Sequence, residues 1–535
     1  MNANSNGFRS FALVMGLILL FSWIKLEKPA SDDNSGNLEL VSGDGLVAVD
    51  EATGDAAADA TGTASGAAAG TSSGKKTTSA GGGTTAGRAA TGGTAGGTAT
   101  GGRAGGSSGG AGGTAGGGTA GGGSGSGSGG NSDLQCAAGK NGGDLRGNVP
   151  GVSATKIKLA TTAVLDGPAK TLLESSVTGM KAVLDKVNRA GGICGRTLEL
   201  KVVNDNFNAA QGQQYIRNFI AEDYFALPVV PSAEGLGAAI KAEDISRAGI
   251  PVVGTDGMRV EQYTDPWVWP VASATVTAMR TMVRHAATAY NAKTFAIVYD
   301  EKYQFGKEGL EAFKRQVTAE GGTLKFELGL NPDQGTYGGE KNQWQNACGA
   351  ADDPKCDMVA LLLLPDTAKQ WLGQQPTKAA VYQAGAQTLF TDKFAKDCVQ
   401  SMGSACNGIE VWTGYNPPIG ALATTPGVAA YVSDVKRTDQ SVETNNQFLM
   451  GAYLGMSVFV EALKKVGPNL SRAAVRDAMN SMTFQTDLTS TLTWTAGDHK
   501  ANKSSQSFAM RVGQGSFQGW EKKTGFQPDP GSGLL

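Results

Sequence analysis

Short apolar runs alternate with amphipathic stretches from residue 156 onward. The runs are rich in Val, Ile and Leu, and the stretches between them place apolar residues at helical spacing. The first predicted strands are residues 156–163, Leu198–Asn204, Phe225–Val230 and Ile250–Gly254. The helices predicted between them are residues 173–187, Ala209–Ala221 and Gly235–Ala248. Strands that alternate with helices through short connections predict an α/β fold with a mostly parallel sheet flanked by helices.

A second series of the same kind begins near residue 294. Its predicted strands are Thr294–Asp300, Thr323–Leu328, Asp357–Leu364, Thr388–Thr391 and Ile409–Gly414. Its predicted helices are residues 307–320, residues 340–347, Asn446–Val466 and Arg472–Ser481. A folded part of roughly 400 residues exceeds one ordinary core, so we expect two lobes with a cleft between them. Ligands of open α/β sheets bind beyond the carboxyl ends of the strands, which makes the loops after the strands the candidate site.

The N-terminal part of the chain has a different character. Residues 11–24 form a long apolar run that is short for a membrane span. We expect residues 1–30 to be a signal or anchor segment, and the lysine at position 28 favours an uncleaved anchor over a cleaved secretion signal. Residues 31–131 are expected to be a flexible linker, because their Gly/Ala/Thr/Ser-rich tract cannot bury enough apolar surface to fold. Such a tract typically spans on the order of 50 Å.

Charge and titratable residues exclude several functions. The chain has 46 Lys and Arg against 48 Asp and Glu, a net charge of −2, which gives no electrostatic case for a nucleic-acid partner. It has two histidines and no C-x-x-C, so we expect no metal site and no cofactor. Neither histidine belongs to a nucleophile arrangement, and we therefore expect no enzymatic activity.

The six cysteines indicate export to an oxidising compartment. Two close pairs each flank a turn-like loop, which favours local pairing over the many other connectivities that six cysteines allow. The expected disulfides are Cys348–Cys356, Cys398–Cys406 and Cys136–Cys194.

Four collinear segments carry a family resemblance. They are IKLATTAVLDGPAK, GMKAVLDKVNRAGGICGRTLEL, AGIPVVGTDG and KTFAIVYDEKYQFGKEGLEAFKRQVTAEGGTL. From Ile157 to about Trp520 the chain resembles type I periplasmic-binding-protein domains, above all the branched-chain amino acid receptors of ABC importers. The resemblance implies a two-lobed fold in which each lobe is a mostly parallel sheet flanked by helices. The three crossovers of its hinge would lie near Pro270–Ala274, Trp412–Gly414 and Trp494–Gly497.

The same resemblance implies a division into lobes. The first lobe would comprise residues 132–274 and 413–495, and the second residues 275–412 and 496–525. Residues 526–535 would form a tail.

The resemblance also implies ligand-binding residues in two loops of the first lobe. Ser232 and Ala233 follow the third predicted strand, where the family offers a hydroxyl and backbone N–H groups to a ligand carboxylate. Thr255 and Asp256 follow the fourth strand and match the second such loop. Asp256 departs from the family pattern, because it brings a negative charge into a loop expected to bind a carboxylate. Ser232 and Thr255 would also suit the simpler role of helix caps.

Two further ligand-binding residues are implied in the second lobe. Phe305 stands where many members of the family have a tyrosine that packs on the ligand, although it could equally pack in the core of its lobe. Asp392 lies near the family's acidic partner for a ligand ammonium, although it could also pair at the surface with Lys393.

The function implied is that of an extracytoplasmic solute-binding protein of an ABC importer. It would bind a small polar ligand, an amino acid or a related carboxylate or amide, and would present it to a permease. The protein would lie at the cell surface or in the periplasm, held to the membrane by its N-terminal segment. The alternative is a membrane-tethered sensor that uses the same ligand-binding lobes.

Overall fold

The computed structural model describes residues 40–41, 148–167, 169–350, 353–374, 380–531 and 533. The expected signal or anchor segment lies outside these residues, as does the expected linker apart from positions 40 and 41. Cys136 also lies outside them.

The first sheet is parallel and belongs to the part that we call lobe 1. Strand β2 (Lys156–Ala163) pairs with β3 (Thr197–Asn204) along its whole length, and β1 (Leu40–Val41) pairs with the other edge of β3. Single parallel bridges continue the sheet from β2 through the predicted strands at 225–230 and 250–254. These segments are extended but lack a continuous ladder, and Pro228 and Pro251 within them have no N–H to donate.

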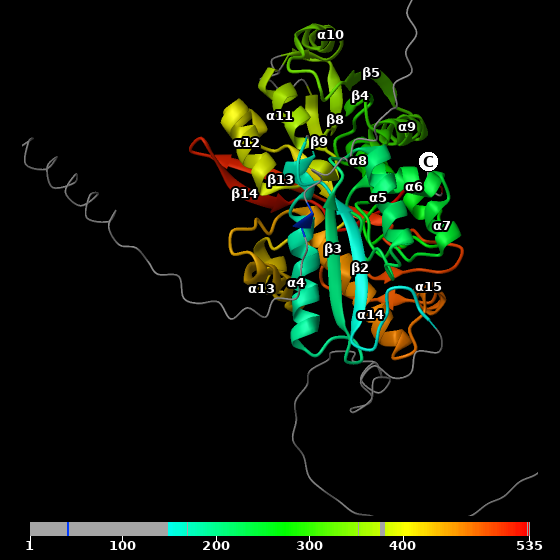
Figure 1. Cartoon of the computed structure of the whole chain (residues 1–535). Helices are drawn as coiled ribbons and strands as arrows, with labels where there is room; N and C mark the ends of the chain where they lie inside the picture. The colour runs from blue at the N-terminus through cyan, green and yellow to red at the C-terminus, as the bar shows by residue number, and fades with distance from the viewer. Residues whose placement is uncertain are drawn as a thin grey trace, which may run out of the picture. The chain divides into compact units, whose positions relative to one another are not determined.

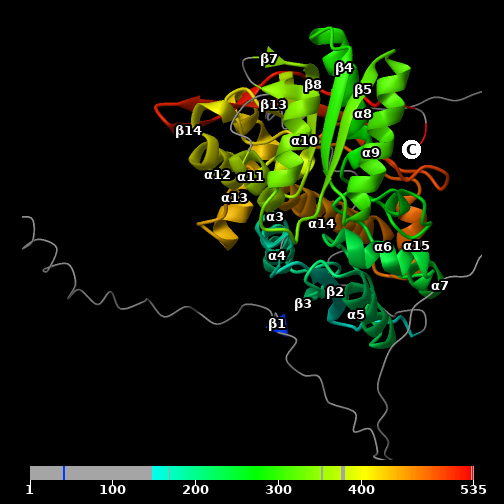
Figure 2. The same cartoon turned by 90° about the horizontal axis from the view of Figure 1, so that it is seen from above.

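Helices cover both faces of this sheet, as Figures 1 and 2 show. One face packs against α4 (Ser176–Arg189) and α14 (Gln447–Val466), and the other against α5 (Ala209–Ala221) and α6 (Ala233–Lys241). The remaining helices of lobe 1 are α3 (Lys170–Leu173), α7 (Asp244–Ala248), η2 (Val260–Tyr263), η5 (Gly420–Thr424), α13 (Pro426–Thr438) and α15 (Arg472–Met479). Helix α14 begins where the Asn446 side chain accepts the backbone N–H groups of Phe448 and Leu449.

The second sheet forms the centre of the part that we call lobe 2. Its strand order is β14-β13-β10-β9-β8-β4-β5. Strands β5, β4, β8, β9 and β10 are parallel, β13 is antiparallel to β10, and β14 is antiparallel to β13. The strands are β4 (Thr294–Asp300), β5 (Thr323–Leu330), β8 (Cys356–Leu362), β9 (Ala380–Gly385), β10 (Glu410–Thr413), β13 (Ser504–Gly513) and β14 (Ser516–Lys522). The short strand β15 (Gln527–Pro528) pairs with the start of β13.

Lobe 2 is covered in the same way. Helices α8 (Thr275–Ala289) and α9 (Gln304–Ala319) pack on one face of the sheet, and both views place them beside β4 and β5 (Figures 1 and 2). Helices α10 (Gly338–Cys348), α11 (Pro365–Gln374) and α12 (Asp392–Met402) pack on the other face.

The chain passes between the two sheets three times. The first passage precedes α8, the second follows β10, and the third lies between the short strand β12 (Leu492–Thr493) and β13. The two-lobed α/β fold with a three-crossover hinge is thereby confirmed, while the exact lobe boundaries stay a prediction.

One predicted strand is wrong. Residues Thr388–Thr391 do not form a strand: a 3-10 helix, η3 (Gln387–Leu389), leads into α12, and the strand of this region is β9. The segment is buried although it is a turn, with the Thr388 hydroxyl donating to the Leu363 carbonyl at 2.7 Å. A buried turn is apolar for the same reason as a buried strand, because both face the core. The composition of this short segment therefore cannot distinguish a turn from a strand.

Two of the expected disulfides are confirmed. Cys348 and Cys356 are bonded with their Cα atoms 5.0 Å apart, and Cys398 and Cys406 with theirs 6.1 Å apart. Both bridges lie in lobe 2. Cys194 is also disulfide-bonded, and Cys136, its expected partner, lies outside the described residues.

Candidate functional site

The two lobe 1 loops predicted to bind a ligand lie side by side. Val230 and Thr255 form a parallel bridge, so the loops after them leave the same carboxyl edge of the sheet. The first loop carries Ser232 and Ala233 into α6, and the second carries Thr255 and Asp256 toward the hinge.

Ser232 is completely buried and precedes α6 without making a side-chain cap. Its Oγ has no hydrogen bond of normal geometry within the described residues. It lies near Asp205, whose pKa is raised to about 6 by burial while the hydroxyls of Ser232 and Thr162 act in the opposite direction. Ser232 is therefore not a helix cap, and its hydroxyl interacts with the buried Asp205 carboxyl.

Thr255 and Asp256 shape the second loop. The Thr255 hydroxyl accepts the backbone N–H of Gly257 at 3.3 Å, and Asp256 Oδ1 accepts Met258 N–H at 3.1 Å and Gln262 Nε2 at 2.8 Å. Asp256 Oδ2 is buried with no hydrogen-bond partner among the described residues. Burial raises the pKa of the Asp256 carboxyl to about 7, despite the two hydrogen bonds that oppose this shift.

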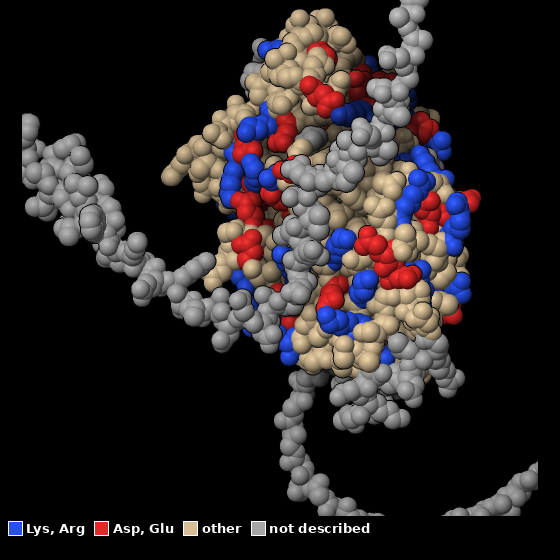
Figure 3. Space-filling model, in the orientation of Figure 1, with Lys and Arg blue, Asp and Glu red and all other residues tan. Residues whose placement is uncertain are grey.

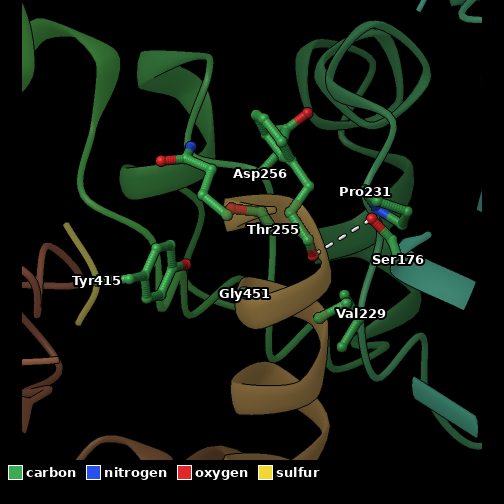
Figure 4. A pocket seen from close by; sticks show the side chains of 10 residues that line it. Ser176, Val229, Pro231, Thr255, Asp256, Tyr415 and Gly451 are labelled. Carbon is green, nitrogen blue, oxygen red and sulfur yellow. Dashed lines mark hydrogen bonds between the residues drawn. The ribbon is translucent and has the colours of Figure 1, made fainter. Parts of the chain in front are cut away.

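Thr255 and Asp256 line a pocket at the base of lobe 1 whose free volume is about 10 Å³, enough for one water molecule. The other lining residues are Ser176, Val229, Pro231, Tyr415, Gln447, Phe448, Gly451 and Ala452. Figure 4 shows Tyr415 and Pro231 on opposite sides of the first turns of α14. The dashed line there is the hydrogen bond from Ser176 Oγ to the Phe448 carbonyl.

The Tyr415 hydroxyl is the second unpartnered polar group of this pocket. Burial and the nearby Asp256 raise its pKa, so it stays protonated and can donate a hydrogen bond. A side chain at position 451 would collide with it, because a Cβ built on Gly451 would lie 2.7 Å from the hydroxyl oxygen. The pocket thus presents one carboxylate oxygen and one hydroxyl without protein partners.

Aromatic side chains form the lobe 2 side of the cleft. Phe305, in the first turn of α9, is wholly buried and stacks on Tyr303 with ring centroids 6.0 Å apart. Tyr303 meets Phe207 of lobe 1 edge-on at 5.0 Å. Ala233 belongs to the same apolar cluster as Phe305, so the lobes touch through apolar groups next to the two loops.

The structure places Asp392 elsewhere. Its Oδ1 accepts Trp520 Nε1 at 2.8 Å and its Oδ2 accepts Asn445 Nδ2 at 3.2 Å, so internal partners occupy both oxygens. Its neighbours Thr391 and Lys393 line a separate groove of about 410 Å³ between α12 and lobe 1. Five of the six predicted ligand-binding residues thus lie around one contact between the lobes, and Asp392 lies at a different one, where its partner Asn445 belongs to lobe 1.

Sequence reasoning missed Tyr415 and Phe207. Tyr415 follows the predicted strand at 409–414, so the rule that sites lie after strands could have found it. Phe207 follows the strand at 198–204 in the same way, but its aromatic partner lies 96 positions further along the chain, a pairing that no local pattern shows.

Within the described residues no group of three or more His, Cys, Asp or Glu side chains is arranged to hold a metal ion. In the same part of the chain, no helix combines the length and apolar character needed to cross a membrane. Basic and acidic side chains are interspersed on the face of the described residues drawn in Figure 3.

Comparison with known proteins identifies the class of this fold. The sequence profile described as "Periplasmic binding protein" matches residues 156–516, which is more than half of the chain. The chain belongs to the periplasmic binding protein family, of type I. Family membership makes it a ligand-binding protein and implies an extracytoplasmic location. No curated protein matches the sequence.

Solved structures share the fold at low sequence identity. A fatty acid ABC transporter substrate-binding protein from Thermomonospora curvata is 17% identical with a TM-score of 0.62, and the match covers 72% of this chain and 95% of that chain. A solute-binding protein of an ABC transporter from R. palustris, in complex with benzoate, is 15% identical with a TM-score of 0.56 and coverage of 70% and 98%. A possible leucine/isoleucine/valine-binding protein from Rhodopirellula baltica is 16% identical with a TM-score of 0.57 and coverage of 70% and 97%.

Proposed function

We propose that the protein is the solute-binding component of an ABC importer and closes its two lobes on a small polar ligand, an amino acid or a related carboxylate or amide. One observation carries the proposal: among the described residues, Asp256 Oδ2 and the Tyr415 hydroxyl are buried in one pocket without hydrogen-bond partners. Buried polar groups are nearly always hydrogen-bonded, so unpartnered groups at the carboxyl edge of a sheet favour a binding role.

The ligand-binding residues of this proposal come from both lobes. Ser232, Ala233, Thr255 and Asp256 would hold the polar end of the ligand, and Phe305 with its stacked neighbour Tyr303 would cover it. Ligand contacts on both lobes exist only when the lobes are closed, so binding shifts the population toward the closed state.

The chemistry of Asp256 narrows the ligand further. An anionic group placed beside this carboxylate would be repelled, whereas an amide or amino group would satisfy Asp256 Oδ2. Among the three proposed ligand classes, we therefore favour those that direct a hydrogen-bond donor at Asp256 and Tyr415. Asp392 would take part only if it exchanged its present partners for the ligand.

The proteins of similar structure are named as solute-binding or substrate-binding proteins, which supports a solute-binding role. The protein partner in this role would be a permease. The N-terminal apolar run would hold the protein to the membrane, with the folded part outside the cytoplasm. No catalytic step is part of the proposal.

A binding screen tests this function. The full-length chain is heated with single amino acids, their amides, small carboxylates and aromatic acids, and the midpoint of unfolding is measured. A true ligand at 100 times its dissociation constant should add about 2.7 kcal/mol to the free energy of unfolding. Calorimetry should then give one ligand per chain. If no compound of any class raises the midpoint of the folded protein, the proposal is wrong.

The alternative role as a membrane-tethered sensor rests on the same lobes and on the apolar run at residues 11–24. Uptake of the identified ligand distinguishes the two. If the protein is an importer component, deleting its gene should abolish high-affinity uptake of the ligand. If it is a sensor, the deletion should leave uptake intact and change gene expression.

A further inference from the structure

Away from the pocket, a set of charged residues joins the two lobes at the rim of the cleft. The backbone N–H of Val260, in η2 of lobe 1, donates to Glu308 Oε2, on α9 of lobe 2, at 2.8 Å. Glu308 is 5% exposed and lies one turn into α9. A carboxylate of lobe 2 therefore holds the backbone of lobe 1.

In the opposite direction, Glu234 approaches lobe 2, although its Oε1 has no hydrogen-bond partner of normal geometry among the described residues. Glu234, in the first turn of α6 of lobe 1, faces the backbone N–H of Gln304, the first residue of α9. That N–H lowers the pKa of Glu234 against the larger effect of burial. The first N–H groups of a helix have no partner within the helix, so a carboxylate at this position is favourable. Both views show α6 and α9 as neighbours (Figures 1 and 2).

Arg259 links these contacts within lobe 1. Its guanidinium lies 3.2 Å from Glu234 Oε2 and 2.8 Å from Glu261 Oε1, and its side chain is 5% exposed. The glycine at position 237 makes room for it, because a Cβ there would lie 2.6 Å from Arg259 Nη1. Arg259 thus holds the Glu234 side chain in place beside α9. Its positive charge also offsets part of the negative charge of Glu261, which acts on Glu308.

We propose that Glu308, Glu234 and Arg259 form an interlobe latch that holds the cleft closed, independently of the ligand. The latch goes beyond the proposed function, because none of its residues lines the pocket of Thr255 and Asp256. All of its cross-lobe contacts are lost when the lobes separate, while the ion pairs of Arg259 stay within lobe 1.

The latch should also respond to pH. The groups that act on Glu308 are the backbone of Val260, Glu261, Gln304 and Arg259, and Lys241 pairs with Glu261 at 2.7 Å. Glu234 and Asp256 interact with Arg259 from the lobe 1 side. Burial, reinforced by Glu261, raises the pKa of Glu308 to about 7, against the contributions of Val260, Gln304 and Arg259. In an open cleft this carboxyl would be hydrated and would titrate near its ordinary value of roughly 4.3.

The direction of the pH effect follows from these two states. The closed state binds the proton of Glu308 more tightly than the open state, so closure becomes more favourable as the pH falls from about 8 to 6. The protonated carboxyl keeps an oxygen that accepts the Val260 N–H. Burial raises the pKa of Glu234 as well, and its protonation favours closure in the same direction.

The test measures the distance between the lobes in the full-length chain without any ligand. Dyes are attached through Asn218→Cys on α5 and Thr318→Cys on α9, both at exposed positions, and single-molecule energy transfer gives the closed and open populations. Glu308→Gln keeps an acceptor oxygen without the charge, so it should be more closed than the unmodified chain at pH 8 and should lose most of the pH dependence between 6 and 8. Glu308→Ala also removes the acceptor of the Val260 N–H, so its ratio of closed to open molecules should be about tenfold lower than that of Glu308→Gln.

A matched control comes from the same helix. Glu311 on α9 pairs only with Arg315 at the surface, so Glu311→Gln should behave like the unmodified chain. Circular dichroism establishes that each variant is folded. The latch is refuted if the ligand-free chain is open throughout, if Glu308→Ala is as closed as Glu308→Gln, or if Glu308→Gln keeps the full pH dependence. None of these results affects the ligand screen, so the latch can fail while the proposed function stands.

Discussion

In the lobe 1 pocket, polar atoms of Asp256 and Tyr415 are buried without hydrogen-bond partners among the described residues. On the lobe 2 side, the wall is the stacked pair Tyr303 and Phe305, which continues into the apolar core of its lobe. Buried polar groups without hydrogen-bond partners lower the stability of the fold and can form hydrogen bonds with a ligand. Packed aromatic rings stabilise the fold without any ligand. The comparison suggests that lobe 1 recognises the ligand and lobe 2 covers it. Changes in the aromatic wall of lobe 2 should therefore act on stability, and changes in the lobe 1 pocket on binding and on the pH dependence of stability.

The largest effect is expected for Phe305→Ala. The ring is completely buried, so its removal should lower the free energy of unfolding by about 3–5 kcal/mol. Urea denaturation measures the change. Phe326→Ala, at a half-buried position on β5, is the control and should cost clearly less. A loss below about 1 kcal/mol for Phe305→Ala would mean that the aromatic wall does not support lobe 2.

The next effect concerns the covalent bridges of lobe 2. Replacing Cys348 and Cys356 together by serine opens a loop with a sequence separation of 8 residues. In the chain-entropy account this should cost about 2–3 kcal/mol of unfolding free energy, measured again in urea. Ligand affinity should not change, because the bridge lies far from the lobe 1 loops. If the variant were as stable as the parent, the Cys348–Cys356 disulfide would not contribute to the stability of lobe 2.

A smaller effect, of opposite sign, is expected for Asp256→Asn in lobe 1. The folded-state pKa of about 7 lies above the usual unfolded value, so ionisation of Asp256 lowers stability as the pH rises through roughly 4 to 7. The amide cannot ionise, and the variant should be more stable than the parent by about 1–2 kcal/mol at pH 8 and no different at pH 4.

The control for Asp256→Asn is an exposed aspartate. Asp166 is 71% exposed, so Asp166→Asn should follow the pH profile of the parent. If Asp256→Asn were less stable than the parent at pH 8, the buried carboxylate would have a favourable partner that the described residues do not provide.

The smallest effect on stability is expected for Tyr415→Phe. Its hydroxyl has no partner, so its removal should change the free energy of unfolding by less than about 0.5 kcal/mol. Once the screen has found a ligand, the same variant should weaken binding roughly fivefold to a hundredfold, measured by calorimetry. Unchanged affinity in both Tyr415→Phe and Asp256→Asn would move the ligand away from this pocket.

The sequence predicted the fold well where the residues of a single helix or strand show its apolar pattern by themselves. The strand Thr294–Asp300 matches β4 at both ends, because a strand buried on both faces is apolar along its whole length. The strands at 225–230 and 250–254 are less regular than predicted, since their prolines interrupt the ladder. Thr388–Thr391 was misread because burial gives a turn the composition of a strand.

The candidate site was less predictable than the fold. The loops of Ser232 and Thr255 followed from their positions after strands, and Phe305 followed from the family resemblance. Asp392 matched the same resemblance but binds Trp520, which lies 128 positions further along the chain. Phe207 acquires its role from Tyr303 of the other lobe, and Tyr415 from a pocket lined by several elements. Such arrangements depend on packing that a local pattern does not contain.

The central claim is that the lobes close on a ligand. The most direct test is to titrate the ligand found by the screen into the doubly labelled full-length chain and to measure the distance between positions 218 and 318. The account predicts that the open population disappears with the same midpoint as calorimetric binding, and that Asp256→Asn shifts both midpoints together. A ligand that binds one to one while the distance distribution stays the same would contradict it.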